Sequence, residues 1–100
     1  MTARTQRRAL LQLSYLHREL GDLYLASVLA RECLALAEMD EDRLAQAGVL
    51  NTLGNIEHDE GHPDEAREWH ERALAILDAM GGHHEMRATV LTNLGGCIVE

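Results

Sequence analysis

A pattern that returns every 40 residues limits what this chain of 100 residues can fold into. Gly21 and Gly61 lie 40 positions apart, and an alanine follows each of them five positions later. Leucine pairs precede both glycines at matching positions, and a third pair begins 41 residues after the second. The three pairs are Leu10 and Leu13, Leu50 and Leu53, and Leu91 and Leu94. A period of roughly 20–50 residues indicates a repeat protein, in which each copy is one supersecondary unit.

Each copy is predicted to form two antiparallel helices. In the second copy, apolar residues at helical spacing lead up to Gly61, which ends the first helix because glycine tolerates the left-handed backbone conformation. Pro63 then suits the first turn of the next helix. We expect a first repeat over about 4–39, a second over about 44–80 and half of a third over about 84–99. The predicted fold is all-α: an antiparallel helix-pair solenoid of five helices and two and a half repeats, forming one domain over residues 1–100.

The composition favours helices and a reducing compartment. The chain has no Phe and one Pro, so its core must consist of Leu and Ala with some Val, Ile and Met. Cys33 and Cys97 form no paired motif, and Cys33 is expected to be buried in the second helix. No apolar run reaches the roughly 18 residues of a membrane span, and the N-terminus does not resemble a signal peptide. We therefore expect a cytoplasmic protein without a membrane partner, and the Lys-free, Arg- and Ala-rich composition suggests a GC-rich bacterial genome.

The charge is distributed unevenly along the chain. The net charge of −8 argues against nucleic acid as a partner, because phosphate binding needs a basic surface. Residues 1–20, however, carry four arginines against one glutamate and are +3, which leaves −11 for the remainder. An anionic peptide therefore stays compatible with the basic N-terminal segment.

The repeated residues resemble the tetratricopeptide repeat, whose signature combines Leu-Gly with a later Ala-x3-Phe and a further Ala. Leu53-Gly54 and Leu94-Gly95 match the signature, whereas Ser14 replaces the glycine of the first copy. The phenylalanine position holds Ala30 and His70. The family's usual period is about 34 residues. The longer period here is similar to that of kinesin light chain, the spindle-orientation adaptors and repeat-containing bacterial regulators.

The resemblance implies a non-catalytic protein–protein interaction scaffold that binds a partner peptide or helix in a concave groove. In this family the first helix of each pair lines the groove. Carried over by position, the lining residues are Arg4, Arg8, Leu11, Gln12, Tyr15 and Arg18, then Asn51, Thr52, Asn55 and His58, then Thr92, Asn93 and Gly96. Arginine suits a carboxylate and asparagine suits a peptide backbone, so we expect an acidic or C-terminal peptide as ligand. The same polar residues would equally serve to solvate an unused helix face.

A second interpretation is that the chain is a sensor or oligomerisation segment of a bacterial regulator. The second helix is apolar almost all round, and the fifth has no sixth helix to cover it. The faces predicted to self-associate comprise Tyr24, Leu25, Val28, Val90, Leu94 and Ile98. Three possibilities remain open at this point: a homodimer, a fragment of a longer repeat array, and a fifth helix that acts as a simple cap.

Metal-binding or hydrolytic activity is the remaining alternative. His58 and His62 are four residues apart, but Gly61 and Pro63 interrupt the helix between them. We therefore interpret these histidines, and His83 and His84 in the next link, as solvated loop residues and expect no metal or other cofactor. The sequence contains neither a glycine-rich phosphate loop nor a nucleophile elbow, so we expect no enzyme.

Overall fold

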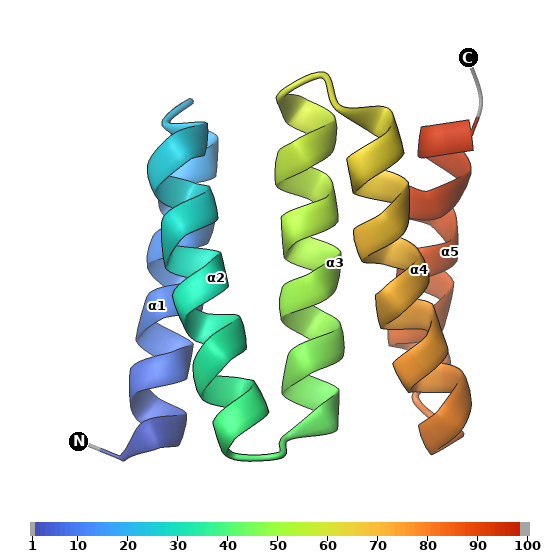
Figure 1. Cartoon of the computed structure of the whole chain (residues 1–100), viewed down its shortest axis with the longest axis horizontal. Helices are drawn as coiled ribbons and strands as arrows, with labels where there is room; N and C mark the ends of the chain where they lie inside the picture. Colours follow the sequence, from blue (N-terminus) through green and yellow to red (C-terminus); the bar gives the residue numbers. More distant parts are fainter. Residues whose placement is uncertain (1, 99–100) are drawn as a thin grey trace.

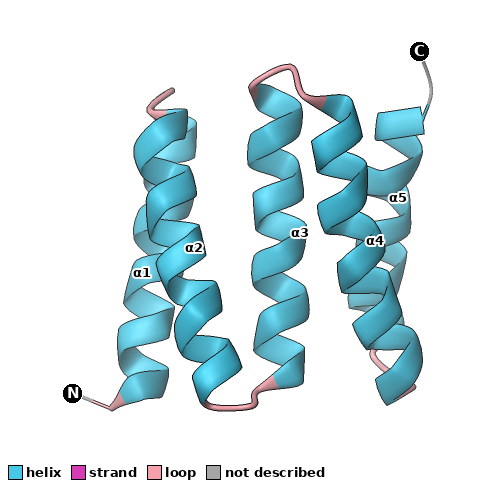
Figure 2. Cartoon of the chain, viewed as in Figure 1, coloured by secondary structure: helices cyan, strands magenta, loops and turns pink. Residues whose placement is uncertain are grey.

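Five consecutive helices make up the protein, and the prediction of an all-α fold is confirmed. The computed structural model describes residues 2–98, and side chains as far as residue 96. The helices are α1 (Ala3–Glu19), α2 (Leu23–Met39), α3 (Arg43–Asp59), α4 (Pro63–Met80) and α5 (His84–Ile98) (Figure 1). Short loops join them, and no strand occurs within residues 2–98 (Figure 2).

Three tight turns of one kind connect the first four helices. The turn residues Gly21, Glu41 and Gly61 have φ values of 85°, 55° and 83°. In each turn the residue that follows donates its backbone N–H to a carbonyl five positions back, at 2.8, 3.0 and 2.9 Å. Two of the three positions are glycines because a left-handed backbone strains a residue that carries a Cβ.

The helices pack as antiparallel neighbours. α1 contacts α2, α2 contacts α3, α3 contacts α4, and α4 contacts α5 (Figure 1). α3 also contacts α5 directly, and the hydroxyl of Thr52 on α3 lies 3.5 Å from the hydroxyl of Tyr15 on α1. The odd-numbered helices α1, α3 and α5 therefore share one side of the molecule, as a helix-pair solenoid requires.

Small residues sit where the helices cross. Six alanines are completely buried: Ala26, Ala30, Ala37, Ala47, Ala66 and Ala73. At Gly54 of α3, a Cβ would lie only 2.5 Å from the imidazole of His70 on α4. At the matching place in the first repeat, the buried hydroxyl of Ser14 donates to the carbonyl of Ala26 at 2.7 Å. The absence of Phe is thus compatible with a dense core, because close crossings need little side-chain volume.

Candidate peptide-binding groove

A cavity of about 480 Å³ opens on the side shared by α1, α3 and α5. It combines basic side chains with apolar ones. The lining residues are Arg4, Thr5, Arg7, Arg8, Leu11 and Tyr15 of α1, Cys33 of α2, Asp42 before α3, Leu44, Ala45, Gly48 and Val49 of α3, and Met86 of α5. A concave, largely apolar site with a few polar groups is the usual form of a ligand-binding pocket.

One arginine of the cavity has a structural role. The largely buried side chain of Arg7 forms ion pairs with Asp40 at 3.2 Å and with Asp42 at 3.0 Å, tying α1 to the α2–α3 turn. The pKa of Asp42 lies below its ordinary value, first because the N–H of Ala45 donates to the carboxylate and then because Arg7 lies beside it. The positive charge of Arg7 is therefore already balanced within the fold.

The other two arginines of the cavity are not balanced in this way. Arg4 and Arg8 are exposed, and neither forms an ion pair with a carboxylate among the described side chains. With Asp42 already paired to Arg7, Arg4 and Arg8 leave the cavity with net positive charge, although the protein as a whole is acidic. Their guanidinium groups are free to bind an anionic group from outside.

The floor of the cavity includes a thiol that is sheltered from solvent. Cys33 is 2% exposed, and its Sγ donates to the carbonyl of Arg7 at 3.4 Å. Burial raises the pKa of the Cys33 thiol, and the charge of Arg7 opposes this effect only in part. The predicted burial of Cys33 is confirmed, and the protonated thiol contributes to packing.

Four of the expected groove residues line this cavity and the others do not. Arg4, Arg8, Leu11 and Tyr15 meet there. Arg18 instead lines a neighbouring hollow with Tyr15, Glu19 and Asp59, and its Nε donates to the carboxylate of Asp59 at 2.5 Å. Arg18 is thus engaged by α3, contrary to the expectation of a guanidinium open to a ligand.

The expected polar row on α3 and α5 bonds largely to the protein itself. The amide of Asn93 donates to the side-chain oxygen of Asn51 at 3.1 Å. Thr52 is buried and donates to the carbonyl of Gly48, while Thr92 donates to the carbonyl of Ala88 at 2.9 Å. Of the residues outside the cavity, Asn55 is half-buried, and the exposed ones are Gln12, His58, Thr92 and Gly96. The cavity therefore lies nearer the start of α3 than the groove expected from the sequence.

The apolar floor was not found from the sequence. It is formed by Leu44 and Val49 of α3 with Met86 of α5. The sequence does contain a signal for part of this surface. Gly48 and Leu44 lie three and seven residues before Asn51, so helical spacing places all three on one face. The cavity lies on the expected side of α3 but one to two turns nearer its N-terminus than the expected groove residues.

The faces expected to self-associate are only partly uncovered. Tyr24 is 79% and Val28 is 41% exposed, whereas Leu25 and Leu94 are half-buried. The prediction for Val90 is wrong: this residue is completely buried, because α5 packs it into the same core cluster as Leu53 and Leu77. The side chain of Ile98 lies outside the described residues.

Three exposed leucines extend the uncovered surface. Leu13, Leu16 and Leu20 are 44%, 49% and 69% exposed and share one face of α1 by their spacing. We refer to these leucines, with the exposed Tyr24 and Val28 of the adjoining helix α2, as the α1–α2 apolar face.

Stacked antiparallel helix pairs that cross at alanine and glycine define an α-helical repeat protein. The tetratricopeptide repeat family model matches residues 5–79 and again 45–97. The chain belongs to the tetratricopeptide repeat family. A search among curated proteins found no match. None of the helices described between residues 2 and 98 is both long and apolar enough to cross a membrane.

Proposed function

We propose that the chain is a non-catalytic interaction module that holds a peptide of a partner protein in the cavity between α1, α3 and α5. Tetratricopeptide repeats commonly mediate protein–protein interactions. The observation that carries the proposal is the cavity itself, where two unpaired arginines stand beside an apolar floor.

The chemistry of the cavity favours an acidic peptide or a C-terminal carboxylate. Arg4 and Arg8 are one helical turn apart on α1, so their guanidinium groups can reach the same anionic group. Leu44, Val49 and Met86 offer an apolar surface next to them. A ligand that presents a carboxylate beside an aliphatic side chain satisfies both parts of the cavity.

Removal of either unpaired arginine is expected to weaken binding about tenfold, since a hydrogen bond to a charged group is worth about 1.5–3 kcal/mol. The probe is a fluorescein-labelled peptide of alternating leucine and glutamate with a free C-terminus, titrated into wild type, Arg4→Ala and Arg8→Ala. Arg67→Ala on α4, an exposed arginine away from the cavity, is the matched control and should bind like wild type. Equal affinity in all four proteins, or no binding to wild type, would overturn the proposal. An amidated copy of the peptide separates recognition of the C-terminus from recognition of glutamate side chains.

Self-association through the α1–α2 apolar face is a second candidate function. Its five side chains carry no charge, so two copies can bring the same face together without repulsion, as a two-fold dimer requires. Exposed clusters of this kind mark interaction surfaces. A second copy of this chain is therefore a suitable partner for the face.

Sedimentation velocity tests the dimer. Wild type should shift from monomer to dimer as its concentration rises, while Leu16→Glu should remain monomeric because it would place two like charges in the interface. Leu91→Glu on α5 removes a similarly exposed leucine (40% exposed) and is the control. A wild type that stays monomeric at the highest soluble concentration would exclude this function.

A further inference from the structure

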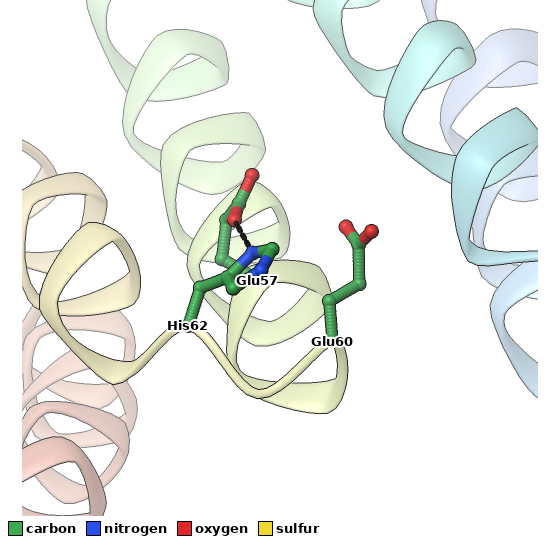
Figure 3. A group of neighbouring side chains, drawn as sticks. All are labelled: Glu57, Glu60 and His62. Carbon is green, nitrogen blue, oxygen red and sulfur yellow. Dashed lines mark hydrogen bonds and ion pairs between the residues drawn. The ribbon is translucent and has the colours of Figure 1, made fainter.

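Three side chains at the α3–α4 turn bring possible metal ligands together. Glu57 lies in the last turn of α3, Glu60 follows the helix, and His62 precedes α4. One ligand atom from each lies within 4.8 Å of the others, and this is the single such group of three among the described side chains. The Nδ1 atom of His62 is 2.9 Å from Oε2 of Glu57. Figure 3 shows the imidazole turned back over the end of α3 toward Glu57, with Glu60 extending from the same turn.

The turn does not need these side chains in order to form. Forty residues earlier, the α1–α2 turn has the same backbone hydrogen bonds with His17, Leu20 and Asp22 at the matching positions. A donor set of one nitrogen and two carboxylates is therefore absent from an equivalent turn of the same protein.

His62 does not cap the helix that follows it, unlike the residues at the matching positions of the other turns. Asp22 and Asp42 cap the helices that follow them, accepting from the N–H of Leu25 at 3.1 Å and of Ala45 at 3.0 Å. His62 occupies the same place before α4 and makes no side-chain cap hydrogen bond. A capping residue stabilises a helix, so folding alone favours aspartate here. The imidazole points toward the carboxylate of Glu57 instead.

The surroundings of the cluster attract a cation. The C-terminal end of α3 carries the negative end of the helix dipole, and Glu57 and Glu60 add two carboxylates. The side chain of Glu57 is 12% exposed, with one oxygen 3.7 Å from Arg31 and the other directed to His62. The two carboxylates and the end of α3 together make this turn attractive to a metal cation.

The geometry points to a site for a divalent first-row transition metal ion, such as zinc, formed by Glu57, Glu60 and His62. Imidazole nitrogen and carboxylate oxygen bind zinc at about 2.0–2.2 Å, and water completes a tetrahedral shell. The ion would tie the end of α3 to the start of α4 and stabilise the folded chain in proportion to its occupancy.

Calorimetric titration of zinc chloride into the full chain tests the site. Wild type should take up about one ion per chain and unfold at a higher temperature with zinc than without it. Glu60→Gln and His62→Asn should each weaken zinc binding at least about tenfold, because each removes a ligand. Asparagine is itself a good N-cap residue, so His62→Asn retains the fold. The thermal shift should disappear in both variants.

The double variant His83→Asn, His84→Asn is the matched control, since these exposed histidines lie just before α5 and at its first residue, outside the cluster. It should bind zinc like wild type. The inference is overturned if wild type binds no zinc, if the Glu60 and His62 variants bind it as tightly as wild type, or if the control loses it. Cobalt(II) gives an independent readout: a thiolate charge-transfer band would place the ion on cysteine and overturn the assignment.

Discussion

Gly54→Ala is expected to destabilise the protein by about 2 kcal/mol. The new Cβ would lie 2.5 Å from Cε1 and Nε2 of His70 and 2.8 Å from its Cδ2, and both residues are completely enclosed. Overpacking of this kind costs about 1–3 kcal/mol and occasionally more. The better helix propensity of alanine returns at most about 1 kcal/mol. Denaturation in urea, followed by circular dichroism, measures the difference.

Gly48→Ala is the matched control for this substitution. It lies in the same helix, but a Cβ at Gly48 would meet nothing within 4 Å. The control should therefore be stabilised by up to about 1 kcal/mol through helix propensity alone. Truncating the imidazole in the double variant Gly54→Ala, His70→Ala should cost less than the sum of the two single changes, because the clash is removed. If Gly54→Ala proves as stable as Gly48→Ala, α3 and α4 do not cross as closely as described.

Acidification from pH 7 to pH 4 is expected to remove about 3 kcal/mol of stability through His70. The side chain is completely buried, and neither ring nitrogen has a hydrogen-bond partner among the described residues. Burial, with a smaller contribution from the nearby charge of His58, lowers the pKa of His70 to about 4. In the unfolded chain His70 accepts a proton near pH 6.5, whereas in the folded chain it accepts one only near pH 4. The stabilising contribution is therefore complete above pH 6.5 and is lost as the pH falls through this window.

His70→Phe tests this expectation, because phenylalanine keeps a ring against Gly54 and cannot be protonated. Its free energy of unfolding should fall less than that of wild type between pH 7 and pH 4, by about 3 kcal/mol. His84→Asn, which removes an exposed histidine, should keep the acid sensitivity of wild type. Parallel pH curves for wild type and His70→Phe would show that His70 is not the responsible group. The pKa of His62 lies above its ordinary value, mainly because its ring is hydrogen-bonded to Glu57. Protonation of His62 therefore stabilises the fold at low pH, opposite to the effect of His70, and His62 is present in all three proteins.

The fold could be predicted from the sequence because its determinants are local and repeat. Gly61 and Pro63 mark a helix end and a helix start, and Ala66 and Ala73 mark a crossing. Each of these signals acts over a few residues, and the 40-residue period repeats two of them, because Gly61 corresponds to Gly21 and Ala66 to Ala26. The rule of small residues at crossings also accounts for Ser14, whose hydroxyl is satisfied within the core.

The lining of the cavity could be predicted only where it depends on one helix. Arg8 and Tyr15 were expected to share one face of α1, and both line the cavity. The engagement of Arg18 by Asp59, 41 residues away, depends on how two repeats lie against each other, which no local pattern encodes.

Exposure likewise depends on neighbours. Leu13 and Leu53 hold the same repeat position, yet Leu13 is 44% exposed and Leu53 is completely buried. Leu53 is covered because α3 packs closely against both α2 and α4. Among the described residues, α1 packs closely against α2 and meets α3 only through a few side chains.

The three equivalent turns at Gly21, Glu41 and Gly61 lie 20 residues apart, which is half of the repeat period. The link between the first and second repeats is therefore the same structural element as the turn inside a repeat. The boundary between these two repeats is then a matter of side-chain pattern rather than of backbone. From α1 to α4 the backbone joins each helix to the next in the same way, whether or not the two helices belong to one repeat.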